Sequence, residues 1–214
     1  MMEIKKNITT KNFNVGNINR IKYIVIHFTA NNGDTALGNT NYFKEYRGSS
    51  AHYFVDENNI YQSVEDKNIA WHCGANKYKH SYCRNTNSLG IELCSRKDSN
   101  GKYYFKDKTV ENAVELVKML MTKYNVPATN VIRHYDVTGK NCPEPFVRDI
   151  KAWQNFKSRL EEKVVKQNIK IKGKIKTVDA INKDGYTYVK IRDLSDILNI
   201  GYDKDSKLIS VSVK

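Results

Sequence analysis

Two separated stretches carry the residues around which the chain is organised. They are Ile24-Val25-Ile26-His27-Phe28-Thr29-Ala30 and Arg133-His134-Tyr135-Asp136-Val137-Thr138-Gly139-Lys140-Asn141-Cys142-Pro143. The first is an apolar run that delivers a histidine, and the second is a polar loop with a histidine, a lysine and a cysteine. Two imidazoles and one thiolate form a three-ligand zinc set that leaves the fourth tetrahedral position open, which is typical of a catalytic zinc. The stretches therefore predict a zinc hydrolase with His27, His134 and Cys142 as ligands.

Composition limits the class of protein. A chain of 214 residues is long enough for one medium domain and a small one, with a sizeable core that needs no disulfide bonds. Lysine and arginine number 36 against 23 acidic residues, and the net charge of +13 favours binding to a polyanion. Nucleic acid, anionic lipid and anionic cell-wall polymer all fit that charge, which by itself does not choose among them.

The amino-terminal residues and the cysteines indicate the compartment. Residues 1–7 lack the apolar segment of a secretory signal, and no run approaches the ~18 apolar residues of a membrane span. We therefore expect a soluble product that stays inside the cell until something releases it. The four cysteines are Cys73, Cys83, Cys94 and Cys142. A reducing compartment disfavours disulfides, so a bond between Cys73 and Cys83 is the less favoured alternative.

A strand and a helix are expected in the first part of the chain. Residues 21–28 predict a strand buried on both faces, with His27 at the carboxyl end, where open α/β sheets present ligand-binding residues. The helix is expected from Asp34, as its N-cap, to Glu45. Its candidate inward residues are apolar or aromatic: Leu37, Tyr42, Phe43 and Tyr46.

A hairpin, a long loop and an unusual strand follow. Residues 52–64 predict a hairpin that turns at 56–59, and the loop at 65–88 is long enough to be functional. The next strand, Leu89-Gly90-Ile91-Glu92-Leu93-Cys94, contains one acid. A buried carboxylate costs several kcal/mol unless it is paired or protonated. An ion pair with a base, or a strand end open to water, explains Glu92 as well as a functional role does.

Apolar residues at helical spacing predict two more helices. The first begins at Thr109 and ends before Pro127, with these residues inward: Val110, Ala113, Val114, Val117, Leu120, Met121 and Tyr124. The second carries a stripe that is far more typical of a core than of a ligand site: Phe146, Ile150, Trp153, Phe156 and Leu160.

A change of composition after Leu160 predicts a second domain. We expect a catalytic domain over residues 1–163 and a small domain over residues 164–214, with a charged linker at 161–167. The small domain has eleven basic and six acidic residues, so both parts are basic. Its patterns predict a ββαβ unit, with elements at 169–178, 185–189, 192–199 and 208–213. Leu194, Ile197 and Leu198 are expected inward, as are Ile209, Val211 and Val213.

Taken singly, each candidate ligand has an ordinary explanation. A lone strand histidine is more often a packed core group, Cys142 could be a small buried hydrophobe, and Lys140 a solvated loop lysine. The combination is stronger. A zinc ion would offset the desolvation of Glu92, which could then act as the base for the metal-bound water, while Lys140 would supply charge for the oxyanion.

Five ordered motifs resemble a known family. They are Ile24-Val25-Ile26-His27, Ser50-Ala51-His52-Tyr53-Phe54-Val55, Ala70-Trp71-His72-Cys73-Gly74, Leu89-Gly90-Ile91-Glu92-Leu93 and His134 with Cys142-Pro143. Over about residues 20–160 the chain resembles the type-2 N-acetylmuramoyl-L-alanine amidases, which include phage endolysins, bacterial autolysins and the peptidoglycan recognition proteins. The resemblance implies an α/β fold, a mixed central sheet flanked by helices with one Zn²⁺ in a substrate groove. It also implies hydrolysis of the amide between N-acetylmuramic acid and L-alanine in peptidoglycan.

The resemblance also assigns residues by position. His27, His134 and Cys142 match the zinc ligands of the family. Glu92 matches the catalytic acid of many members, and Lys140 matches the lysine of the Lys-x-Cys-Pro variant. Trp71 and two histidines that are not ligands, His52 and His72, match groove positions and are expected to bind the substrate. For the two histidines, support of the site from behind the groove is the alternative. In some members a functional tyrosine precedes the equivalent of His52. Here that position is Ala51, so the acid/base role is expected of Glu92.

The carboxyl-terminal part resembles, more loosely, a small repeat of bacterial surface proteins named after the amino-terminal domain of copper amine oxidases. The residues concerned are Gly185-Tyr186-Thr187-Tyr188-Val189 and Ile191-Arg192-Asp193-Leu194. This part contains no His, Cys or Met, so no copper site is expected. It suggests attachment to the cell wall and its anionic polymers, with a role in stability or dimerisation as the alternative.

Two rival functions share some of these features. A non-catalytic peptidoglycan-binding protein would share the fold, but loss of the cysteine ligand is one mark of such proteins and Cys142 is present. A nucleic-acid-binding protein would fit the charge, but the lysines are spread over both parts and no nucleic-acid motif occurs. We therefore expect an endolysin-like enzyme that acts on the wall after release, without a nucleic-acid partner or membrane span.

Overall fold

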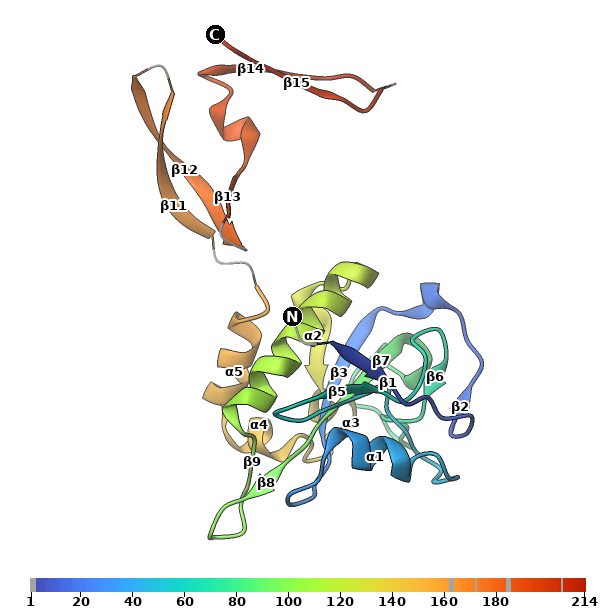
Figure 1. The fold of residues 1–214 in the computed structure, drawn as a ribbon. Coiled ribbons are helices and arrows are strands. Elements are labelled where there is room, and N and C mark those ends of the chain that lie inside the picture. The colour runs from blue at the N-terminus through green and yellow to red at the C-terminus, as the bar shows by residue number, and fades with distance from the viewer. Residues whose placement is uncertain (1–2, 162–163, 172, 184–185, 205) are drawn as a thin grey trace. The chain divides into compact units, whose positions relative to one another are not determined.

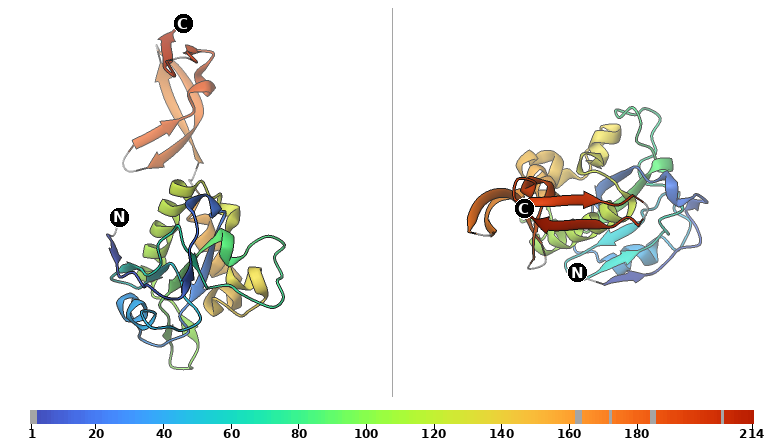
Figure 2. Two further views of the ribbon diagram at one scale, coloured as in Figure 1. Left: turned by 90° about the vertical axis from the view of Figure 1, so that its right-hand side faces the viewer. Right: turned by 90° about the horizontal axis from the view of Figure 1, so that it is seen from above.

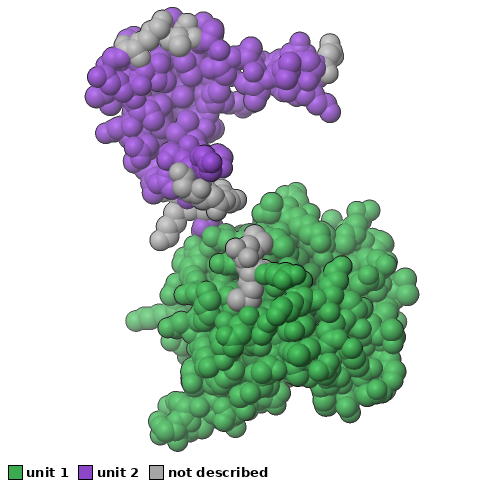
Figure 3. Space-filling view, viewed as in Figure 1, with its two compact units in different colours: residues 1–160 green, residues 161–214 purple. Residues whose placement is uncertain are grey.

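A mixed six-stranded sheet forms the centre of the larger of two units. The computed structural model describes residues 3–161, 164–171, 173–183, 186–204 and 206–214. The two units are Met1–Leu160 and Glu161–Lys214 (Figure 3). Each unit has its own hydrophobic core.

The central sheet confirms the predicted mixed architecture. Its strands lie in the order β1 (Ile4–Lys6), β5 (Ile60–Gln62), β4 (Tyr53–Val55), β7 (Ser88–Leu93), β3 (Tyr23–Phe28) and β10 (Val131–Arg133). Neighbours are parallel except for β4 and β5, which form the predicted antiparallel hairpin. Two small ribbons pair β2 (Phe13–Asn14) with β6 (Ile69–Ala70) and β8 (Arg96–Lys97) with β9 (Tyr103–Tyr104).

Helices flank the sheet. They are α1 (Ala36–Tyr42), α2 (Asp107–Tyr124), α3 (His134–Thr138), α4 (Glu144–Arg148) and α5 (Ile150–Ser158), with short 3₁₀ turns η1 (Ile18–Arg20), η2 (Asn85–Asn87) and η3 (Ala128–Asn130). Helices α2 and α5 pack on one face of the sheet (Figures 1 and 2). The predicted helix after Thr109 is confirmed as α2, which begins two residues earlier.

Alternation along β3 and β7 separates an apolar face from a polar one. Successive side chains of a strand point to opposite faces. One set packs with the helices in the main core: Ile24, Ile26, Leu89, Ile91 and Leu93 from the strands, and Val114, Val117, Leu120, Trp153 and Phe156 from the helices. The other set, which includes His27, Gly90 and Glu92, points to the opposite face. The functional residues are therefore backed by the main core without being part of it.

The prediction for α1 is wrong in its inward face. Thr35, rather than Asp34, caps the helix through a hydrogen bond to the Gly38 N–H, and the helix ends at Tyr42. Leu37, Tyr42 and Tyr46 are exposed, and of the four candidates Phe43 alone packs inward. Small or polar residues face the sheet instead: Ala36, Asn39 and Thr40. The Asn39 amide donates to the Asp34 carboxylate at 2.6 Å. This polar contact helps to place Asn39 on the inward face of the helix, although the helix has more hydrophobic residues on its other side.

The predicted second aromatic helix is broken in two. Asp149 separates α4 from α5, and its carboxylate accepts from the backbone N–H groups of Lys151 and Ala152, which starts a new helix. Because of this break Ile150 is exposed, contrary to prediction. The rest of the stripe is confirmed in the core: Phe146, Trp153, Phe156 and Leu160.

The loop at residues 65–88 folds over the polar face. It contains β6 and η2 and buries Cys73 and Cys83 in a small cluster with Val25 and Val137. All four cysteines are free in the structure.

The smaller unit is mostly β. A three-stranded antiparallel sheet contains β11 (Val164–Ile171), β12 (Lys174–Lys183) and β13 (Tyr186–Val189), and a hairpin pairs β14 (Leu198–Tyr202) with β15 (Ile209–Val213). A 3₁₀ turn, η4 (Ile191–Leu194), lies between them. Val178, Leu194 and Leu198 form its core.

Several predictions for this unit need correction. Residues 164–167 belong to β11 and not to a linker, since they pair with β12. The helix predicted at 192–199 is a single 3₁₀ turn, because the last two of these residues pair in β14. Leu194, Ile197 and Leu198 are nevertheless buried as expected. Ile209 and Val211 are exposed, since β15 belongs to a two-stranded ribbon. Gly185 and the Val213 side chain lie outside the description.

Candidate metal centre

Strand register brings three functional residues to one level of the sheet. In the parallel pair β3 and β7, His27 lies opposite Glu92. In the parallel pair β3 and β10, Ile26 lies opposite Arg133, so the next residue, His134, falls beside His27. Residues in register on parallel strands point to the same face, which puts two imidazoles and a carboxylate together at the carboxyl ends of three strands.

Cys142 completes a compact set of donor atoms. One donor atom from each of His27, His134 and Cys142 lies within 4.8 Å of the others, and all three residues are buried. The Cys142 Sγ is 3.7 Å from Nδ1 of His27, and the rings of His27 and His134 are 4.6 Å apart at their centroids. The three residues predicted as ligands are thus brought together.

The polar loop is held in shape by its own hydrogen bonds. The Arg133 guanidinium donates to both carboxylate oxygens of Asp136, at 3.0 and 2.8 Å, and to the Phe146 carbonyl. The Tyr135 N–H donates to the Cys142 carbonyl at 2.7 Å, which holds the end of the loop next to its start. Gly139 ends α3 with a φ of 86°, a conformation that favours glycine. The cysteine is therefore placed by backbone geometry.

Burial sets the protonation of the three donors. It lowers the pKa of His27 well below its usual value and that of His134 to about 4, and the charge of Lys140 adds to both effects. The imidazoles are then neutral, the form that binds a metal. Burial raises the pKa of the Cys142 thiol to about 12, so a metal that binds the thiolate must displace its proton.

The surroundings of the Glu92 carboxylate independently indicate that a cation would fit beside the three donor atoms. Its Oε1 is 4.0 Å from Nδ1 of His27, and its Oε2 is buried without a hydrogen-bond partner among the described residues. Burial raises the pKa of Glu92 to about 8, while the charge of Lys140 acts in the opposite direction. Neither ordinary explanation suffices, since the side chain is only 20% exposed and its one neighbour at ion-pair distance in the described chain is a neutral histidine. An N,N,S donor set beside an unpartnered carboxylate fits zinc.

A groove runs across the donor atoms. One part has a volume of about 830 Å³ and is lined by residues that include His27, Glu92 and Cys142. An adjoining part of about 670 Å³ shares residues with it: Ser49, Trp71, His72, His134 and Lys140. The Trp71 indole is fixed by a 2.6 Å hydrogen bond to Asn14 Oδ1. Two predicted groove residues, Trp71 and His72, and the predicted catalytic residue Lys140 therefore line the groove that contains the donor atoms.

His52 does not line this groove, contrary to the prediction of a substrate contact. Its side chain is 0% exposed, and the Gly90 N–H donates to its Nδ1 at 3.0 Å. With Nδ1 as acceptor, the ring hydrogen is on Nε2, which lies 3.1 Å from the Asn68 carbonyl. His52 therefore joins β4 to β7 from inside the protein.

Sequence reasoning missed Ser88 and Asn85, which hold His72. Ser88 Oγ is 3.1 Å from Nε2 of His72, and Asn85 Oδ1 accepts from the His72 N–H at 3.1 Å. A signal was present in Gly90, because an isolated glycine in an apolar strand often marks a close approach. A Cβ on Gly90 would lie 2.5 Å from Cγ of His72.

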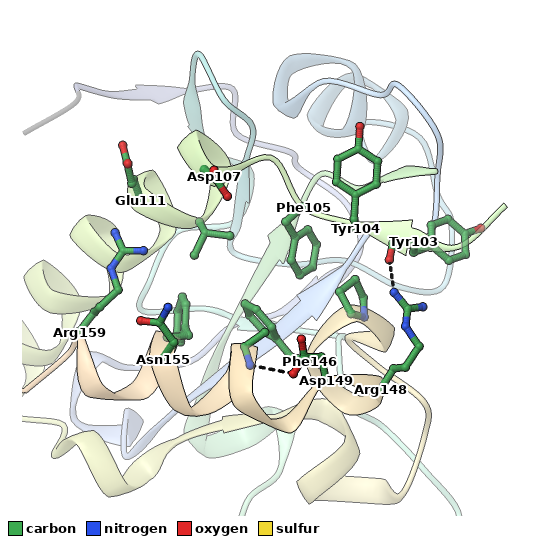
Figure 4. Close-up of a pocket in the computed structure, with 14 residues that line it drawn as sticks. Tyr103, Tyr104, Phe105, Asp107, Glu111, Phe146, Arg148, Asp149, Asn155 and Arg159 are labelled. Carbon is green, nitrogen blue, oxygen red and sulfur yellow. Dashed lines mark hydrogen bonds between the residues drawn. The ribbon is translucent and has the colours of Figure 1, made fainter. Parts of the chain in front are cut away.

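A second pocket lies among the helices (Figure 4). Its volume is about 490 Å³, it shares no lining residue with the groove, and none of its lining residues is a histidine or cysteine. Two of its charged groups have local partners: Arg148 donates to the Tyr103 carbonyl at 2.7 Å, and Asp149 caps α5. Nothing in this lining resembles the metal centre.

Comparison with known proteins agrees with this fold. The family model described as N-acetylmuramoyl-L-alanine amidase matches residues 17–145. The "Probable N-acetylmuramoyl-L-alanine amidase" of Bacillus licheniformis is 36% identical over 160 residues, 71% of this chain and 44% of that protein. This chain therefore spans less than half the length of that relative.

Two solved structures extend the comparison. A mutant endolysin from Bacillus subtilis superposes with a TM-score of 0.62 at 31% identity, covering 75% of this chain and 100% of that one. The amidase AmiD from E. coli, solved with the substrate anhydro-N-acetylmuramic acid-L-Ala-D-gamma-Glu-L-Lys, gives a TM-score of 0.52 at 26% identity, over 65% of this chain and 57% of that one.

Fold and donor set together define a mixed-sheet domain with a candidate zinc centre of two imidazoles and one thiolate. More specifically, the chain belongs to the N-acetylmuramoyl-L-alanine amidase family. Within the described residues, no helix is both long and apolar enough to cross a membrane.

Proposed function

We propose that this protein hydrolyses the amide bond between N-acetylmuramic acid and L-alanine in bacterial peptidoglycan. The observation that carries the proposal is the buried set His27, His134 and Cys142 beside the unpartnered carboxylate of Glu92, in a chain of the amidase family. The AmiD structure was solved with a substrate that contains this bond, which supports the same substrate class here.

The donor set and Glu92 divide the chemistry. His27, His134 and Cys142 would hold zinc, which when bound supplies a Lewis acid for the scissile carbonyl and lowers the pKa of water. Glu92 takes a proton from the attacking water and passes it to the nitrogen of the leaving L-alanine. Its place in register with His27 directs the carboxylate to the same face as the donor atoms. Its raised pKa suits a group that must both accept and return a proton near neutral pH.

Two groove residues bind and orient the substrate. The Lys140 ammonium places positive charge near the oxyanion that forms when the carbonyl is attacked. Trp71 offers an aromatic surface for a sugar or stem peptide, held in place by its bond to Asn14. His52, being fully buried, is left out of the substrate contacts.

Release of new amino termini tests the proposal. Purified walls incubated with the zinc-loaded chain should gain free L-alanine amino termini. Glu92→Gln should lower the rate of this gain by about 10²-fold or more while walls are still bound. Binding by the unchanged chain without any such release would instead indicate a non-catalytic peptidoglycan-binding protein.

We further propose that residues 161–214 attach the enzyme to the wall, as a module like the repeat named after the copper amine oxidase amino-terminal domain. The unit is basic and exposes aromatic residues, including Tyr186, Tyr188 and Tyr202, which suit contact with anionic polymers or sugars. The solved endolysin chain from Bacillus subtilis is matched over 100% of its length by 75% of this chain. A shortened chain that ends at Leu160, where the larger unit ends, therefore serves as the control for wall binding. Equal wall binding by the full and shortened chains would contradict attachment. This enzyme would act on the wall after release from the cell, as an endolysin does.

A further inference from the structure

His72 lies next to the donor set without belonging to it. Its Nδ1 is 3.0 Å from Nε2 of His27, and its Nε2 is 3.1 Å from Ser88 Oγ. Ser88 Oγ is in turn 2.6 Å from the Arg84 carbonyl oxygen. These four groups form a continuous hydrogen-bond chain that ends at a metal ligand.

The chain of hydrogen bonds can run in one direction when the imidazoles are neutral. Two oxygens 2.6 Å apart need a hydrogen between them, and a carbonyl has none, so the Ser88 hydroxyl donates to Arg84. Ser88 must then accept from Nε2–H of His72. A neutral imidazole has one donor and one acceptor, so Nδ1 of His72 accepts Nε2–H of His27.

The consequence for His27 is a defined tautomer. With its hydrogen on Nε2, Nδ1 carries the free lone pair, and Nδ1 is the atom that lies 3.7 Å from Cys142 Sγ and 4.0 Å from Glu92 Oε1. In proteins, metal-binding histidines commonly donate the other ring N–H to a fixed partner, which orients the ring and raises its basicity.

The fold holds the His72 ring from two sides. The ring packs on the backbone of Gly90, where a Cβ would come within 2.5 Å of it. Asn85 Oδ1 accepts hydrogen bonds from the backbone N–H groups of both His72 and Cys73, at 3.1 and 2.8 Å, and these bonds hold the backbone that carries the ring. Ser88 and Gly90 belong to β7, the strand that also carries Glu92. The same strand therefore positions the proposed base, Glu92, and the two residues that hold the His72 ring.

We infer that His72 is a positioning residue that accepts Nε2–H of His27 and so presents the unprotonated Nδ1 of His27 to the metal. The inference rests on the zinc site of the proposed function. It assigns to His72 a role inside the protein, distinct from the substrate contact expected from its place in the groove.

Nuclear magnetic resonance of the metal-free chain tests this directly. With ¹⁵N-labelled histidine at pH 8, two-bond ¹H–¹⁵N spectra should show both His27 and His72 protonated at Nε2. Protonation of His27 at Nδ1 would overturn the inference, and this measurement needs no variant.

Zinc affinity, measured by competition with a chelator, supplies the second test. His72→Ala should weaken zinc binding by about 10–100-fold. His72→Asn, whose side-chain oxygen can accept in place of Nδ1, should restore much of the loss, and Trp71→Ala should leave the affinity unchanged. Unchanged affinity in His72→Ala overturns the inference even if walls are still cleaved. Tight zinc binding by the unchanged chain without wall cleavage would instead contradict the proposed function alone.

Discussion

The two faces of the central sheet use the same strands for opposite purposes. On β3 and β7, Ile26 and Ile91 pack against helices in the main core, while His27 and Glu92, their immediate neighbours in sequence, meet at the metal centre. The apolar face contributes stability through burial, whereas the polar face buries imidazoles and a carboxylate at a cost in free energy. Stability and chemistry are thus separable, and substitutions on the two faces should fail in different ways.

The largest effect is expected from the metal ligands. His27→Ala and Cys142→Ser each remove one of three donors, so zinc content and wall hydrolysis should both fall to background, as measured by metal analysis and wall lysis. Cys94→Ser changes another buried cysteine that is not in the donor set and should keep its zinc. Stoichiometric zinc in Cys142→Ser would contradict the assigned ligands.

Glu92→Gln should separate chemistry from metal binding on the same face. The amide cannot take a proton from water, so hydrolysis should fall by about 10²-fold or more while zinc content stays at that of the unchanged chain. The matched control is Glu111→Gln, which alters a carboxylate in the second pocket and should keep full activity. Full activity in Glu92→Gln would show that the base is another group.

Phe156→Ala tests the apolar face. Phe156 is fully buried in the main core, and its truncation should lower the free energy of unfolding by about 3–5 kcal/mol. Zinc bound per folded molecule should not change, because the ring packs with Phe146 and Trp153 in the main core, on the face of the sheet opposite His27. Denaturant unfolding and metal analysis provide the two measurements, and loss of zinc from the folded variant would show that the faces are coupled.

The smallest effect concerns pH. Burial lowers the pKa of His52 well below its usual value, so the unfolded chain binds the proton more readily than the folded one. The contribution to stability is complete above the unfolded pKa of about 6.5 and is lost as pH falls below it, by up to about 1.4 kcal/mol per pH unit for each such group. Denaturant unfolding of the metal-free chain between pH 8 and 5 measures the slope. Equal stability across that range would mean that the buried histidines titrate normally.

How far the sequence predicts the molecule also differs between the faces. Periodicity was sufficient to predict α2, and the resemblance carried by five ordered motifs implied the mixed sheet. Residue types alone were sufficient to group His27, His134 and Cys142 as candidate ligands. Glu92 stood out as an acid in an apolar strand, a conflict that a site can explain. These signals are local in sequence or carried by residue type.

What the sequence could not predict depends on hydrogen bonds between distant residues. The inward face of α1 is selected by polar contacts of Asn39 and not by its aromatic residues, and Asp149 breaks a helix that periodicity alone would continue. The burial of His52 and the support of His72 by Ser88 require strand register, which spacing does not give. A histidine's role was therefore harder to predict than its presence near the site.

Mass spectrometry of a defined wall fragment tests the central claim most directly. A soluble N-acetylmuramic acid carrying its stem peptide, treated with the zinc-loaded chain, should yield the free sugar acid and a peptide that begins with L-alanine. The products together should contain one added water. Cleavage within the peptide or between sugars, with the lactyl amide intact, would contradict assignment as an N-acetylmuramoyl-L-alanine amidase.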